Sequence, residues 1–177
     1  NIMRMLARAG CEVTVVPAHT QAGEIMAMHL HGVVLSNGPG DPAAVPYVVE
    51  TVRALIGRIP LLGICFGHQM LGLALGGTTY KLKFGHRGCN QPVKDLASGK
   101  VSITSQNHGF CVDRESLTDS DIELTHINLN DHTLEGMRHK TLPVFSVQYH
   151  PEAAPGPHDA SYLFDEFTGM MKRWIGA

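Results

Sequence analysis

The residues best suited to chemistry lie in residues 60–69, where a short apolar run ends at a cysteine. Cys65 is preceded by Gly63 and followed by Gly67, each two places away. A strand that turns sharply into a helix holds the residue at the turn in a strained conformation, and flanking glycines leave room for the close approach. The spacing predicts a nucleophile elbow at Cys65, although a buried, inert cysteine is also a common fate of a free thiol.

The residues after Cys65 predict a helix that begins at the elbow. Apolar side chains recur at helical spacing across residues 70–75. The first turn of a helix presents unpaired amides and the positive end of the helix dipole, and both favour a thiolate over a thiol. A thiolate in this position is suited to attack a carbonyl carbon and form a thioester.

A base for this thiol is predicted far downstream in the sequence. Residues 142–149 read as a buried strand that runs directly into His150 and Glu152. Residues two apart in an extended segment point the same way, so Glu152 can orient the imidazole that takes the thiol proton. Without Cys65, a surface turn is the better interpretation of this His-Pro-Glu sequence.

Several ordered motifs across the chain resemble the class I (triad-type) glutamine amidotransferases. Within that family, they are most similar to the amidotransferase domain of carbamoyl phosphate synthetase small subunits. The motifs are residues 36–42 (SNGPGDP), 63–69 (GICFGHQ), 83–88 (KFGHRG), 106–110 (QNHGF) and 149–160 (YHPEAAPGPHDA). The resemblance departs from the family at Cys89 and Gln91, where Gly and His are usual, and this puts the contacts of the predicted loop 84–92 in doubt.

The resemblance implies that the chain splits glutamine to glutamate and ammonia with a triad of Cys65, His150 and Glu152. It places the amides of Gly40 and Phe66 at the oxyanion, although residues 36–42 alone could be only a tight turn. No catalytic task is assigned to His108. The residues that the resemblance places in contact with glutamine are Gly38, Gly40, Phe66, Gln69, Asn107, Gly109 and Phe110.

The resemblance also implies a partner, a large synthetase subunit that uses the ammonia to make carbamoyl phosphate for arginine and pyrimidine synthesis. ATP, Mg and bicarbonate are expected on that partner, and no cofactor in this chain, because no phosphate-loop motif follows residues 36–42. Two alternatives stay open: the glutaminase of anthranilate, GMP or CTP synthesis, and a non-catalytic interaction subunit.

Composition is typical of a soluble, cytoplasmic enzyme domain. The chain has 177 residues, 44% of them apolar, and a formal charge of −2, which gives no reason to expect a nucleic-acid or membrane surface. Its apolar runs fall short of the ~20 residues of a membrane span. The four cysteines show no paired spacing, and the histidines show no metal-binding spacing, so neither a disulfide framework nor a metal site is expected.

Alternating patterns predict an α/β fold with a mostly parallel central sheet flanked by helices, in a flavodoxin-like layering. We expect a single amidotransferase domain over residues 1–177, as a fragment that opens inside its first helix, with the first strand and the N-terminal small-subunit domain absent. The predicted helices are 2–9, 47–56, one after Cys65, and 160–174. The predicted strands are 12–16, 32–37, 61–64, 101–105, 123–128, 133–137 and 144–149.

Overall fold

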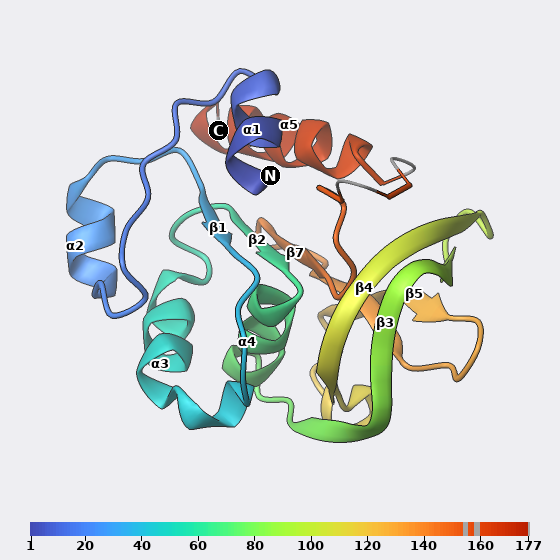
Figure 1. Cartoon of the computed structure of the whole chain (residues 1–177). Coiled ribbons are helices and arrows are strands. Elements are labelled where there is room, and N and C mark those ends of the chain that lie inside the picture. Colours follow the sequence, from blue (N-terminus) through green and yellow to red (C-terminus); the bar gives the residue numbers. More distant parts are fainter. Residues whose placement is uncertain (154–155, 158–159, 177) are drawn as a thin grey trace.

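The computed structural model describes residues 1–153, 156–157 and 160–176, which contain a seven-stranded sheet (Figure 1). Its strand order is β1-β2-β7-β6-β5-β3-β4. Strands β1, β2 and β7 pair in parallel, and the remaining pairs are antiparallel. The α/β fold is therefore confirmed, with a sheet that is parallel on one side and antiparallel on the other. The strands are β1 (Val33–Leu35), β2 (Leu61–Ile64), β3 (Thr79–Asp95), β4 (Val101–Val112), β5 (Ile122–Asn128), β6 (Leu134–His139) and β7 (Val144–Val147).

Helices cover both faces of the parallel side. Helices α1 (Ile2–Arg8) and α5 (Tyr162–Ile175) lie together on one face, and α2 (Ala22–Ala27), α3 (Pro46–Leu55) and α4 (Phe66–Ala74) lie on the other (Figure 1). Side chains alternate along β2, so Leu62 and Ile64 pack with α1 and α5, while Leu61 packs with α3 and α4. Burial on both faces explains why this strand is apolar throughout.

The antiparallel side is dominated by the long hairpin of β3 and β4, which arches away from the helices (Figure 1). The prediction of a loop at residues 84–92 is wrong, because these residues lie within β3. The pairing with β4 shifts register between Lys81 and His86 and again between Gly88 and Gln91. Gly85 and Gly88 have φ values of 69° and 118°, which glycine tolerates, so the strand continues through two irregularities that resemble a loop in sequence.

Most other predicted elements are present, although β1 has half the predicted length and β4 continues seven residues beyond the predicted end. The strand at 61–64 and the helix at 47–56 are confirmed almost to the residue, and the last helix runs over α5. The strand predicted at residues 12–16 is wrong, because these residues form no ladder with any described strand. The alternation of apolar and polar residues here does not come from a strand. Val13 packs against the apolar core, while Val15 is exposed to solvent. The sequence analysis missed α2 and two 3-10 turns, η1 (Pro42–Ala44) and η2 (Arg114–Ser116).

Within the described residues, the helices are too short or too polar to cross a lipid bilayer.

Candidate functional site

Cys65 lies at the junction between the end of β2 and the start of α4. Its backbone has φ 54° and ψ −101°, a conformation that a residue with a side chain rarely adopts and that costs about 1–3 kcal/mol. The Cys65 amide donates to the Val147 carbonyl at 2.9 Å, and the Cys65 carbonyl accepts from the Gln69 amide at 3.2 Å. The strand and the helix thus hold Cys65 in the strained turn that the glycine spacing predicts.

The two flanking glycines make this turn possible. A Cβ on Gly63 would lie 2.6 Å from the Gly67 carbonyl oxygen, and a Cβ on Gly67 would collide with the Leu35 carbonyl. The first turn of α4 therefore sits directly on β1 and β2, with its unpaired amides beside the sulfur. Cys65 itself is the N-cap residue of α4.

His150 and Glu152 form a hydrogen-bonded pair at the same edge of the sheet. His150 Nδ1 lies 2.8 Å from Glu152 Oε1, and the His150 amide donates to the Ser105 carbonyl at 2.9 Å. Burial alone would lower the pKa of His150, but its interactions with Cys65 and Glu152 raise that pKa to about 10. The imidazole therefore interacts with both the sulfur and the carboxylate, and both interactions favour its protonated form.

The Glu152 carboxylate is held by burial and by its backbone. The residue is 8% exposed, and its backbone carbonyl accepts from Asn1 Nδ2 at 2.6 Å. Its second carboxylate oxygen, Oε2, is buried without a hydrogen-bond partner among the described residues. Among the described residues, the hydrogen bond of this carboxylate is therefore the one between Oε1 and His150.

A cavity of about 90 Å³ opens beside Cys65. It brings together six of the seven residues that the sequence analysis places in contact with a substrate, and it adds Pro39 and His108. Phe66 does not line the cavity: its ring packs against Gly38, where an added Cβ would lie 3.3 Å away. Contact roles for these residues stay predictions. The six residues are Gly38, Gly40, Gln69, Asn107, Gly109 and Phe110.

The sequence analysis missed Gln148, which touches the thiol. Its side chain is fully buried, and its Nε2 donates to Cys65 Sγ at 3.8 Å. Its Oε1 accepts from Gln69 Nε2 at 3.1 Å. A polar amide inside an apolar run, two residues before the predicted base, is the signal that could have identified it.

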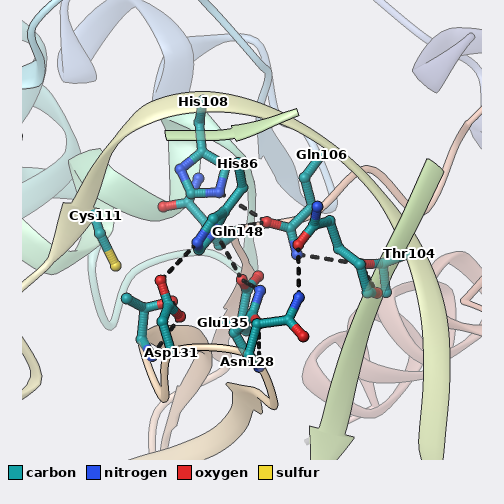
Figure 2. Close-up of polar contacts among 12 residues, drawn as sticks. His86, Thr104, Gln106, His108, Cys111, Asn128, Asp131, Glu135 and Gln148 are labelled. Carbon is teal, nitrogen blue, oxygen red and sulfur yellow. Dashed lines mark hydrogen bonds and ion pairs between the residues drawn. The ribbon is translucent and has the colours of Figure 1, made fainter. Parts of the chain in front are cut away.

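A polar cluster formed by His86, Gln106, His108, Asp131 and Glu135 adjoins the cavity through His108 (Figure 2). Four of its members are buried, and the Asp131 side chain is 40% exposed. His86 Nε2 lies 2.8 Å from Asp131 Oδ2, and His86 Nδ1 lies 3.5 Å from Glu135 Oε1. The hydrogen bond with Glu135, together with Asp131, outweighs burial and raises the pKa of His86 to about 9. Burial lowers the pKa of His108 to about 4. The cluster therefore holds one buried cation, the imidazolium of His86.

Three members of this cluster, His86, His108 and Glu135, have ligand atoms within 4.8 Å of one another. Distance alone would allow a metal ion there. All four ring nitrogens already have hydrogen-bond partners, however, in Gln106, Asp131 and the Phe110 carbonyl. The absence of a metal stays a prediction. Of the tail motif that contributes to the resemblance, residues 154–155 and 158–159 lie outside the described residues.

Close relatives share most of this chain. It is 62% identical over 174 residues to the carbamoyl phosphate synthase small chain of Staphylococcus haemolyticus, and 63% identical over 171 residues to that of Akkermansia muciniphila. These matches cover 98% and 97% of this chain but 48% and 46% of the relatives. The chain spans about half the length of the curated relatives it matches.

A solved structure with a similar fold is that of a putative GMP synthase subunit from Thermoplasma acidophilum, with a TM-score of 0.84 and 24% identity. The likeness covers 98% of this chain and 87% of that one, and it concerns the fold alone. The family model described as glutamine amidotransferase class-I matches residues 1–170. The chain therefore belongs to the class I glutamine amidotransferase family of enzymes.

Proposed function

We propose that this chain hydrolyses L-glutamine to glutamate and ammonia, with Cys65 as nucleophile, His150 as acid and base, and Glu152 as the group that orients His150. One observation carries the proposal: the His150 imidazole interacts with both Cys65 and Glu152, and Cys65 lines a cavity formed by glycine and amide groups. A cysteine and a histidine held by a third group are the minimum apparatus for acyl transfer through a thioester.

In the first half of the reaction, the Cys65 thiolate attacks the carboxamide carbon of glutamine and forms a C–S bond. The His150 imidazolium gives its proton to the departing nitrogen, the C–N bond breaks, and ammonia leaves. In the second half, neutral His150 takes a proton from water, whose oxygen attacks the thioester. The C–S bond then breaks, and glutamate and the thiolate are released.

The developing oxyanion needs donors that are already in place. The Phe66 amide opens the first turn of α4, where helix geometry leaves it without an intrahelical partner. Gly40 lies in the loop after β1 and lines the cavity. Its φ of 96° is one that glycine adopts without strain. We assign the Phe66 and Gly40 amides to the oxyanion. The remaining predicted contact residues, which all line the cavity, are assigned to the polar groups of glutamine: Gly38, Gln69, Asn107, Gly109 and Phe110.

The ammonia is used, in this proposal, by a large synthetase subunit that makes carbamoyl phosphate in the cytoplasm. The relatives named carbamoyl phosphate synthase small chain support this partner. ATP, Mg and bicarbonate act on that large subunit, and this chain itself needs no cofactor.

The test is a Cys65→Ser variant in the full-length small subunit, reconstituted with its partner. Product formation is measured with glutamine and then with ammonium salt, at matched ATP and bicarbonate. We expect loss of the glutamine-dependent reaction and full activity with ammonia, because a hydroxyl at neutral pH is a far weaker nucleophile than a thiolate. Retained activity with glutamine would remove Cys65 as the nucleophile. A wild type that releases ammonia but forms product only with another synthetase would favour anthranilate, GMP or CTP synthesis, and a wild type without glutaminase activity would favour an interaction subunit.

A further inference from the structure

Gln148 occupies a position that the proposed triad does not explain. It follows β7 directly, next to Val147, whose carbonyl accepts the Cys65 amide. Its side chain has no solvent exposure, and its amide nitrogen lies 3.8 Å from Cys65 Sγ. A buried amide needs hydrogen-bond partners at both ends, and here one of them is the sulfur.

The orientation of this amide follows from its neighbours. The Phe110 carbonyl can only accept, and Gln69 lies 2.8 Å from it, so the end of Gln69 that faces Phe110 must be its NH2 group. The same nitrogen lies 3.1 Å from Gln148, which must therefore present its oxygen to Gln69. The NH2 group of Gln148 is left facing the sulfur. A flipped Gln148 would place its oxygen against a thiolate and its NH2 against the NH2 of Gln69, and both contacts are unfavourable.

His108, which also lines the cavity, anchors this orientation. His108 Nδ1 lies 2.7 Å from the same Phe110 carbonyl, which fixes a proton on that nitrogen. His108 Nε2 in turn lies 2.9 Å from Gln106 in the polar cluster (Figure 2). Hydrogen bonds therefore join His108, the Phe110 carbonyl, Gln69 and Gln148.

We propose that Gln148 is a further catalytic residue, whose amide donates a hydrogen bond to the Cys65 thiolate, and that Gln69 is the positioning residue that orients it. This inference rests on the proposed function. The thiolate exists before attack and again when the thioester breaks, and His150 changes its protonation between these steps. An amide donor keeps its proton throughout, so Gln148 stabilises the sulfur anion in both halves of the reaction.

The experiment measures the rate of Cys65 alkylation by iodoacetamide as a function of pH, in the full-length subunit with its partner. The variants are Gln148→Met, which keeps the bulk and removes the donor, and Gln148→Glu, which places an oxygen at the sulfur. A Cys65→Ser variant gives the background from other thiols. Ser146→Ala is the matched control, because Ser146 lies two residues earlier, is equally buried, and bonds to His68 at 2.8 Å instead of to the thiol.

We expect Gln148→Met to slow alkylation at neutral pH about tenfold and to move the pH profile up by about one unit, since a hydrogen bond to a charged group is lost. Gln148→Glu should slow alkylation further, and Ser146→Ala should leave the profile in place. A Gln148→Met profile that superimposes on the wild type, in a protein with an unchanged melting temperature, would overturn the inference. If Gln148→Met does not fold, the near-isosteric Gln148→Glu decides, because a profile equal to wild type would again exclude the donor role.

The readout is thiol reactivity rather than turnover. If the chain proves unable to hydrolyse glutamine, the proposed function fails while the alkylation profile can still be measured. If turnover is normal and the profile does not depend on Gln148, the failure belongs to this inference alone.

Discussion

Gly67, in the first turn of α4, lies directly against the main chain of Leu35 at the end of β1. This contact brings the helix that follows Cys65 onto the edge of the parallel strands. The elbow therefore depends on the absence of a side chain at a position two residues from the sulfur.

Replacing Gly67 with alanine should strongly destabilise the protein. The added Cβ would collide with backbone atoms of Leu35 that cannot move without breaking the pairing of β1 with β2. We expect the free energy of unfolding, measured by urea denaturation, to fall by at least about 2 kcal/mol. Gly23→Ala is the control, because Gly23 lies in α2 with open space around it and should gain about 0.5–1 kcal/mol. Equal stability of Gly67→Ala and wild type would contradict this close packing.

A glutamine-analogue electrophile should label Cys65 much faster than Cys11, Cys89 or Cys111. Burial raises the pKa of the Cys11 thiol and raises that of Cys111 to about 12, so these two are thiols at neutral pH. Cys65 has the imidazolium of His150 beside it, and thiolates react far faster than thiols. Peptide mapping of the labelled protein checks the order. His150→Gln should slow the labelling of Cys65, and a label found mainly on another cysteine would refute the assignment.

The buried His86 should make stability depend on pH. Its pKa is raised from 6.5 to about 9 in the folded protein, so the stabilisation is complete below pH 6.5 and is lost as pH rises through about 9. We expect the unfolding free energy of the wild type to fall by about 1–3 kcal/mol across this pH range. A His86→Gln variant should not show this fall. Denaturation curves at several pH values measure the difference. The exposed His31→Gln should behave as the wild type, and an identical slope in wild type and His86→Gln would exclude a buried cation.

Removal of metal should have no effect. In the described residues, the nitrogens of His86 and His108 already have protein groups as hydrogen-bond partners, and the His86 imidazolium supplies a positive charge beside Asp131 and Glu135. We therefore expect the melting temperature to be the same before and after dialysis against EDTA. Elemental analysis provides the second measurement. Zinc at one equivalent per chain, together with a lower melting temperature after dialysis, would show that a metal holds this cluster together.

The sequence predicted the parts of the fold that depend on local pattern. The strand at 61–64 and the helix at 47–56 have strong apolar periodicity and clear end signals, and both are present. Strand β3 could not be predicted this way, because Gly85, Gly88 and Pro92 are local breakers. Its pairing with β4 and β5 overrides them. Residues 12–16 show the reverse case, in which a good local pattern has no described strand to pair with.

The same distinction applies to the site. The strained turn at Cys65 was predictable because its glycines are adjacent in sequence, and the pairing of His150 with Glu152 because they are two residues apart. The contact between Gln148 and Cys65 could not be predicted in this way. It depends on the register of β7 against β2, which no local pattern determines.

Strand β7 lies between β2 and β6, although it is the last strand of the chain. Cys65 and Gln148 are 83 residues apart, and His150 lies beyond Gln148. A nascent chain that has left the ribosome only through α4 therefore carries the sulfur without its base or its amide donor, and β2 has one open edge. The base and the amide donor reach the sulfur only when β7 pairs with β2.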